Sequence, residues 1–332
     1  MKDFKKFMLF GVAFLSMAIA GCKGGSSPSS SSTEPEADPV GPSVFVLAGQ
    51  SNMEGNSSFT ESSLRSVFTE LEIDDGDCCL TGIEEVRTSY YGQGYDHLKP
   101  EELIGSNPEN KIDGLFLDTK AGMGHSSNAI GPELGCAYRL KSELEEGQKV
   151  YLIKCAFNGS GFDQGEAYPD WKLDESPNLY TDHLKIFTQN CLNLVEEEAG
   201  LKPVVRGFLW NQGESDFDDK KIPLYNDRMN NLLNTFKEDF EEYAPDGDKA
   251  NIAFIDALIY ERNKDLGKRL NDAKLENNRA HADEGYYYVD ATEREGGLGL
   301  TCGVDNLHYD LKSMFRLGMA YADVIIENGL LG

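Results

Sequence analysis

The chain has 332 residues, of which 57 are acidic and 31 are lysine or arginine, so its formal net charge at pH 7 is −26. An acidic surface of this kind repels phosphate groups and anionic lipids, which argues against nucleic-acid binding and against direct contact with a membrane surface. The length is sufficient for one large α/β domain.

Residues 1–21 have the pattern of an export signal. Lys2, Lys5 and Lys6 precede an apolar run that ends in small residues before Cys22, and this run is too short for a permanent transmembrane helix. Cys22 after small residues resembles a bacterial lipoprotein box. We therefore expect an exported protein, lipid-anchored through Cys22 in the cell envelope on the periplasmic or cell-surface side, with a plain secretory signal as the alternative.

Residues 22–42 are rich in serine, proline and glycine and contain no apolar run. Such a composition predicts a flexible tether between the anchor and the folded part. The remaining residues, 43–332, are expected to form a single domain.

Five short apolar runs follow in chain order, and each is continuous rather than alternating, which is typical of strands covered on both faces. They are VFVLAG from Val44, VYLIKCA from Val150, VVRGFLW from Val204, IAFIDAL from Ile252 and YYYVDA from Tyr286.

Stretches with helical spacing separate these runs. One begins near Gly131, a second ends at Gly200, a third follows Pro223, and the last occupies about 311–328. Strands that alternate with helices predict a three-layer α/β/α sandwich with a central, mostly parallel, five-stranded sheet. Residues 56–128 do not follow this rhythm, so we expect a long insertion there, over the edge of the sheet.

The folded part contains an even number of cysteines: Cys78, Cys79, Cys136, Cys155, Cys191 and Cys302. In an oxidising compartment one or two disulfides are plausible, and their pairing stays open. Neither a C-x-x-C nor an H-E-x-x-H spacing occurs, so there is no zinc signature.

Four polar motifs follow predicted strands or precede the last helix. They are GQSNM at 49–53, NGSG at 158–161, WNQGESD at 210–216 and DNLH at 305–308. Because right-handed crossovers place the carboxyl ends of parallel strands at one edge of the sheet, we expect the motifs to meet there.

Ser51 can be a nucleophile or only the N-cap of the following helix. A serine nucleophile needs a base that is oriented by a third group. Asp305 and His308 are three residues apart, so one helical turn would place both side chains on one side. The G-x-S-x-G elbow is not met, because position 53 is Met53.

Acyl transfer also needs hydrogen-bond donors at the developing oxyanion. The backbone N–H groups of Ser51 and Gly159 and the side-chain amide of Gln212 are suitable candidates.

The four motifs together resemble the ordered blocks of the SGNH/GDSL hydrolase superfamily, and more closely those of carbohydrate esterase family 6 and the sialate O-acetylesterases. The resemblance implies a flavodoxin-like fold. By position it makes Ser51 the nucleophile, His308 the base and Asp305 its orienter, with Gly159 and Gln212 completing the oxyanion hole.

The same resemblance gives supporting roles to Gln50, Asn52 and Glu214. One departure is Asn158, which stands where the family usually has glycine. The implied activity is removal of O-acetyl groups from an acetylated oligo- or polysaccharide such as xylan, without a metal or other cofactor. We separately expect a monomer. Acetylated sialic acid is the rival substrate, and a non-catalytic glycan-binding lipoprotein is the alternative from another class.

The other candidate residues have weaker signals. His125 is interpreted as structural or substrate-contacting, and Trp171 as a sugar-stacking platform or a core residue. His97, His183 and His281 have no catalytic partner in the sequence. Tyr286 to Tyr288 are interpreted as part of a strand.

Overall fold

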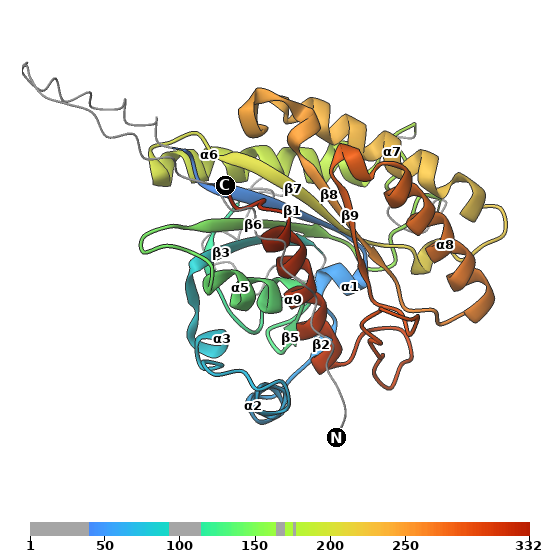
Figure 1. Ribbon diagram of the computed structural model, residues 1–332, viewed down its shortest axis with the longest axis horizontal. Coiled ribbons are helices and arrows are strands. Elements are labelled where there is room, and N and C mark those ends of the chain that lie inside the picture. Colours follow the sequence, from blue (N-terminus) through green and yellow to red (C-terminus); the bar gives the residue numbers. More distant parts are fainter. Residues whose placement is uncertain (1–39, 93–113, 164–169, 175–176) are drawn as a thin grey trace, which may run out of the picture. The chain divides into compact units, whose positions relative to one another are not determined.

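A seven-stranded sheet with the order β4-β3-β6-β1-β7-β8-β9 organises the computed structural model (Figure 1). Neighbouring strands are parallel except for β3 and β4. The strands are β1 (Ser43–Gly49), β3 (Ile83–Gly92), β4 (Leu117–Thr119), β6 (Val150–Ala156), β7 (Val204–Asn211), β8 (Ala253–Leu258) and β9 (Tyr286–Asp290). The structure describes residues 40–92, 114–163, 170–174 and 177–332. The predicted signal, most of the tether and His97 therefore lie outside the described residues.

The five predicted strands are β1, β6, β7, β8 and β9, and they lie side by side in the flavodoxin order, second-first-third-fourth-fifth. The mostly parallel α/β architecture is thus confirmed, and Tyr286 to Tyr288 do lie in a strand. The number of strands was wrong, because β3 and β4 extend the sheet beyond β6. Both come from the segment interpreted as an insertion, which continues the sheet instead of only lying over its edge.

The sequence of β3 explains why this strand was not predicted. Ile83 and Val86 are buried, but Glu84 is exposed and Arg87 is half-buried. Charged residues therefore interrupt the apolar run in the first half of the strand. Its second half, from Thr88 onward, is buried and pairs with β6.

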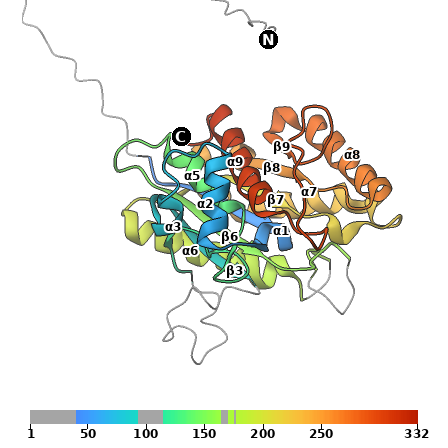
Figure 2. The same ribbon diagram turned by 90° about the horizontal axis from the view of Figure 1, so that it is seen from below.

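Helices cover both faces of the sheet (Figures 1 and 2). On one face α5 (Pro132–Lys141) packs against α9 (Leu311–Glu327), and on the other lie α6 (Lys185–Ala199), α7 (Ile222–Asp239) and α8 (Lys264–Ala280). The smaller elements are α1 (Ser51–Glu54), α2 (Glu61–Glu70), α3 (Cys78–Thr81), the π-helical turn Tyr180–Leu184 before α6, and the two-stranded sheet of β2 (Ser57–Ser58) and β5 (Ala129–Ile130).

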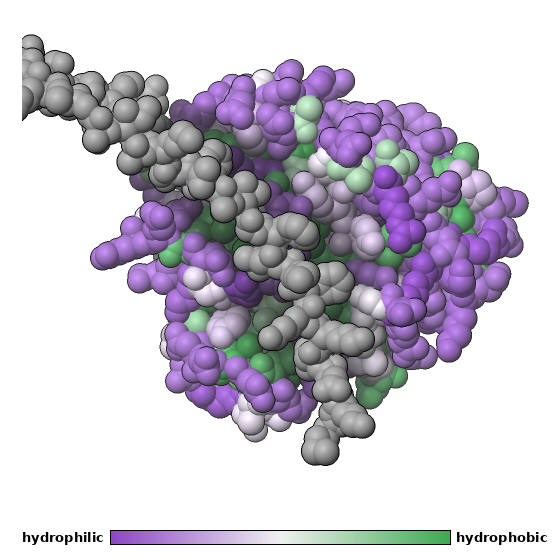
Figure 3. Space-filling model, in the orientation of Figure 1, coloured by the Kyte–Doolittle hydropathy of each residue, from purple (hydrophilic) through white to green (hydrophobic). Residues whose placement is uncertain are grey.

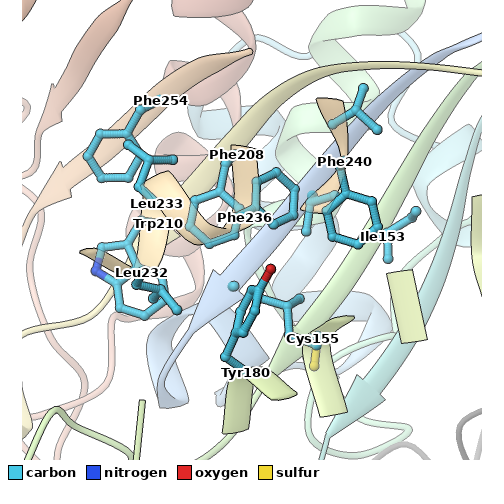
Figure 4. Close-up of a cluster of buried hydrophobic side chains, with 14 of the residues drawn as sticks. Ile153, Cys155, Tyr180, Phe208, Trp210, Leu232, Leu233, Phe236, Phe240 and Phe254 are labelled. Atoms are coloured by element: carbon cyan, nitrogen blue, oxygen red, sulfur yellow. The ribbon is translucent and has the colours of Figure 1, made fainter. Parts of the chain in front are cut away.

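Alternation along β1 divides the core into two layers. Val44 and Val46 belong to the layer under α6 and α7, whereas Phe45 and Leu47 belong to the layer under α5 and α9. Figure 4 shows part of the first layer, in which Phe208 packs near side chains from α7 and β8. Burial of each such large apolar side chain stabilises the fold by roughly 1.5–3 kcal/mol.

The described cysteines do not form the expected disulfides. Cys78, Cys79, Cys136, Cys155 and Cys302 are thiols in the structure. Cys136 and Cys155 belong to the two different core layers, on opposite faces of the sheet, which explains why these two buried thiols do not meet.

The visible surface is mostly hydrophilic, in agreement with the high content of charged residues (Figure 3). None of the helices in the described part of the chain combines the length and the apolar character that a membrane span requires.

Candidate active site

Ser51 lies directly after the end of β1 and is 4% exposed. It is the first residue of α1, and the N-cap position belongs to Gln50, whose side chain makes no capping hydrogen bond. The N-cap interpretation of Ser51 was therefore wrong. Gly49 has a φ of +146°, and a Cβ atom there would lie 2.1 Å from the carbonyl oxygen of Asn211, so only glycine lets β1 and β7 approach this closely before the turn.

Asp305 and His308 form a close pair. The Asp305 Oδ2 atom lies 2.6 Å from His308 Nδ1, and Oδ1 accepts the backbone N–H groups of Leu307 and His308, both at 3.0 Å. The expected helical turn is absent, because Asn306 has a φ of +58° and the carboxylate itself organises a tight turn. Burial alone would raise the pKa of Asp305, but these three hydrogen bonds hold it below its ordinary value.

Asn52 connects the two parts of the site. Its Oδ1 atom accepts the N–H of Tyr309 at 3.2 Å, and its Nδ2 atom donates to the carbonyl of Leu307 at 3.4 Å. Both neighbours of His308 are thus hydrogen-bonded to the residue that follows Ser51. Asn52 is completely buried. The structure therefore brings the predicted nucleophile and the predicted base to the same edge of the sheet.

Glu214, in the short helical turn Glu214–Asp216 after β7, binds Asn52. Its Oε1 atom accepts the Asn52 Nδ2 group at 2.7 Å, and its Oε2 atom is buried without a hydrogen-bond partner among the described residues. Burial raises the pKa of Glu214, although the hydrogen bond from Asn52 lowers it. Glu214 thus contacts Asn52, so its link to the Asp305–His308 turn is indirect.

Gln50 holds the loop after β7. Its Oε1 atom accepts the Nε2 group of Gln212 at 3.2 Å and the N–H groups of Gly213 and Ser215 at 3.2 and 3.3 Å. Gln50 is 2% exposed. Its buried amide therefore fixes the distance between the β1 and β7 loops.

The side-chain nitrogen of Gln212 faces more hydrogen-bond acceptors than it has protons. Besides Gln50, its Nε2 atom faces the carbonyl oxygen of Ser160 at 3.3 Å and Asp216 Oδ2 at 2.6 Å. A primary amide nitrogen carries only two protons, so these three acceptors already take up the donor capacity of the Gln212 side chain. Its role as an oxyanion donor stays a prediction.

Two backbone N–H groups are available for an oxyanion. Gly159 has a φ of +70°, and neither its N–H nor that of Ser51 donates a hydrogen bond within the described residues. The neighbouring Asn158, which departs from the family pattern, binds the side chains of Asn56 and His125. The substitution of glycine by Asn158 therefore adds contacts next to Gly159.

A buried hydrogen-bond network that we did not predict from the sequence holds the backbone carbonyl of Gln212. Lys274 on α8 donates to the Gln212 carbonyl at 2.8 Å and pairs with Asp256 on β8 at 3.0 Å, and Tyr225 donates to the same carbonyl at 2.9 Å. Lys274 is completely buried. An aspartate inside the apolar run IAFIDAL was the available signal, since a buried carboxylate needs a partner.

Asp216 gives a pH-dependent prediction. Burial raises its pKa from 3.8 to about 6, so between these values the native protein binds a proton that the unfolded chain has lost. The free energy of unfolding therefore falls as the pH rises through this range, by up to about 3 kcal/mol. Asp216→Asn should lack this fall, as measured by urea unfolding at pH 4 and pH 7. Asp227→Asn, at an exposed position, is the control, and equal slopes for wild type and Asp216→Asn would contradict the prediction.

The remaining candidate residues have structural partners. Trp171 is completely buried, donates to Ser160 Oγ at 2.8 Å and packs against Trp210, which confirms the core interpretation. The Nδ1 atom of His183 lies 3.0 Å from a tyrosine hydroxyl, and His281 lies 3.1 Å from a glutamate. Within the described ranges, no group of three or more His, Cys, Asp or Glu side chains could hold a metal ion, and independence from cofactors stays a prediction.

A sandwiched, mostly parallel sheet with these polar loops at the carboxyl ends of its strands is the architecture of an α/β esterase. The chain belongs to the SASA family, described as "Carbohydrate esterase, sialic acid-specific acetylesterase", whose model matches residues 107–327. The protein is accordingly an esterase, and the glycan-binding alternative without catalysis is not supported. The match contains Gly159, Gln212 and His308 but begins after Ser51, whose place rests on the geometry above.

Two solved structures are similar in fold. A protein from Arabidopsis thaliana has a TM-score of 0.56 at 18% identity, with 87% of this chain and 99% of that chain covered. NanS has a TM-score of 0.59 at 14% identity, with coverage of 88% and 98%. No curated protein matches the chain.

Proposed function

We propose that the protein removes O-acetyl groups from carbohydrate through an acyl-enzyme formed on Ser51. The observation that carries this proposal is the double contact of Asn52 with Leu307 and Tyr309, because it holds the Asp305–His308 turn against the segment of Ser51. Family membership supports the reaction class.

In the proposed first step Ser51 Oγ attacks the acetyl carbonyl carbon while His308 Nε2 takes the hydroxyl proton. His308 Nδ1 is held by Asp305, which leaves Nε2 as the nitrogen that faces the reaction. The N–H groups of Ser51 and Gly159 stabilise the oxyanion. The bond between the carbonyl carbon and the sugar oxygen then breaks, and His308 returns the proton to that oxygen.

The second step repeats the chemistry with water. His308 removes a proton from a water molecule, whose oxygen attacks the acetyl-Ser51 carbonyl. The tetrahedral intermediate collapses, acetate leaves, and the Ser51 hydroxyl regains its proton from His308. No other reactant is needed, since hydrolysis of an ester consumes only water.

Two substrate classes are candidates. The sequence led us to expect acetylated plant polysaccharide such as xylan, whereas the description of the family favours O-acetylated sialic acid. Acetate release from acetylated xylo-oligosaccharide and from 9-O-acetyl-N-acetylneuraminic acid, measured side by side, separates them. A preference in kcat/KM for one ester identifies the class, and release from neither ester nor from an aryl acetate would refute the esterase proposal.

We also propose export and lipid anchoring through Cys22, as a monomer. This part is supported by the sequence pattern alone, since residues 1–39 lie outside the described part. The mass of the mature amino-terminal peptide, with or without a lipid on Cys22, checks it.

A further inference from the structure

His125 lies in a loop that is fixed to the nucleophile segment. Its backbone N–H donates to the carbonyl of Gly55, the residue that ends α1, at 2.8 Å. Its side chain is 38% exposed, unlike the buried polar residues that hold the β1 and β7 loops together. The imidazole therefore reaches solvent next to the short helix that begins with Ser51.

A chain of hydrogen bonds orients this imidazole. The Ser51 carbonyl can only accept, so the Asn56 amide 2.9 Å away presents its Nδ2 group, which also donates to Asn158 Oδ1 at 2.8 Å. The Asn158 Nδ2 group must then point to His125 Nδ1, 3.2 Å away. Each step fixes the orientation of the next side chain, because an amide has one donor end and one acceptor end.

These hydrogen bonds determine which nitrogen of the His125 ring carries the proton. An Nδ1 atom that accepts from Asn158 leaves the proton of neutral His125 on Nε2. Glu54 Oε1 is 3.4 Å from the same Nδ1 atom and already accepts the hydroxyl of Tyr90 at 2.5 Å. Even a doubly protonated ring keeps the Nε2 proton. Among the described residues no group accepts from Nε2, so the His125 Nε2–H is a spare donor.

We infer that His125 is a substrate-binding residue whose Nε2–H donates to an oxygen of the sugar that carries the acetyl group. This inference rests on the proposed esterase function. The His125 side chain is partly exposed and its backbone is bound to the residue that ends α1, so this donor lies near the nucleophile segment, beside which the acetylated sugar would bind. Asn158 contacts His125 and directly precedes Gly159, so the proposed sugar-binding side chain is hydrogen-bonded to the loop that carries the proposed oxyanion donor.

Two conservative substitutions give opposite outcomes. His125→Asn places an acceptor near the Nδ1 position and deletes the Nε2 donor, whereas His125→Gln places an amide donor near the Nε2 position and deletes Nδ1. The loss of one neutral hydrogen bond predicts that His125→Asn raises KM for the acetylated sugar about five- to tenfold, with a smaller change in kcat. His125→Gln should restore most of the affinity.

The assay compares the better of the two sugar esters with 4-nitrophenyl acetate, which has no sugar oxygens. The loss caused by His125→Asn should be smaller on the aryl ester. The inference is overturned if His125→Gln is the more damaged variant, or if both variants lose activity equally on both esters, because either result assigns His125 a structural role through Asn158.

Failure of the esterase proposal gives a different result. Wild-type protein would then cleave neither ester, and the affinity of the intact sugar esters, measured by isothermal titration, still decides on His125. Weaker binding by His125→Asn than by His125→Gln supports the inference, and equal binding overturns it.

Discussion

Ser51→Ala should lower kcat/KM for ester hydrolysis about a thousandfold or more, because the acyl-enzyme cannot form without the hydroxyl. The fold should tolerate the change, since the serine side chain neither caps α1 nor fills a large volume. The measurement is steady-state hydrolysis of 4-nitrophenyl acetate and of the acetylated sugar. A fluorophosphonate probe should add its mass to the peptide that contains Ser51 in wild type only.

Ser62→Ala is the matched control, because Ser62 is an exposed residue of α2 outside the site. It should keep wild-type activity and labelling. Retention of activity by Ser51→Ala, or labelling of another serine in wild type, would place the nucleophile elsewhere.

The strands that carry the site could be predicted because they are buried on both faces. A continuous apolar run such as that of β1 needs no partner to be recognised, and β7 and β8 are equally clear. The parallel alternation of strands and helices predicted that the loops of Ser51 and Gln212 lie at one edge of the sheet. The flavodoxin-like arrangement was implied only by the family resemblance, and the structure shows that β1 and β7 are neighbours.

Helix α8 shows where hydrophobic periodicity fails. Its inward face carries Asn271, Lys274 and Asn278, which are buried and bind Ile259, Gln212 and Asp256. Apart from Gly267 and Leu270, the buried residues of α8 are polar, so its sequence shows little of an apolar stripe and the helix was not predicted. The polar face is needed because the groups that it supports are themselves buried and polar.

The series of hydrogen bonds from the Ser51 carbonyl to His125 shows a second limit of prediction from the sequence. Asn56, Asn158 and His125 are far apart in the sequence, and each would pass as an ordinary loop residue. Their joint effect depends on which amide end faces which neighbour, which only the packed loops determine. Asn158 was visible as a departure from the family pattern, but its partners were not.

Asp305→Asn should lower kcat/KM by about a hundred- to ten-thousandfold, although the substitution is nearly isosteric. The Asn oxygen can still accept the N–H groups of Leu307 and His308, as Oδ1 does now, so the turn should persist. The Oδ2 position becomes an amide donor, which favours the wrong tautomer of His308. Hydrolysis kinetics and thermal unfolding together separate this loss from unfolding.

His308→Ala and the double variant complete the argument. If Asp305 acts only by orienting His308, the double variant should be no slower than His308→Ala alone, since residues that act as a unit do not add. His281→Ala, which removes a partly exposed histidine paired with Glu284, controls for loss of an imidazole. Additive losses in the double variant, or full activity of Asp305→Asn, would show that Asp305 does not act through His308. We expect Asp305 and His308 to act as one catalytic unit because Asp305 Oδ2 lies 2.6 Å from His308 Nδ1. This contact is only partly shielded from solvent.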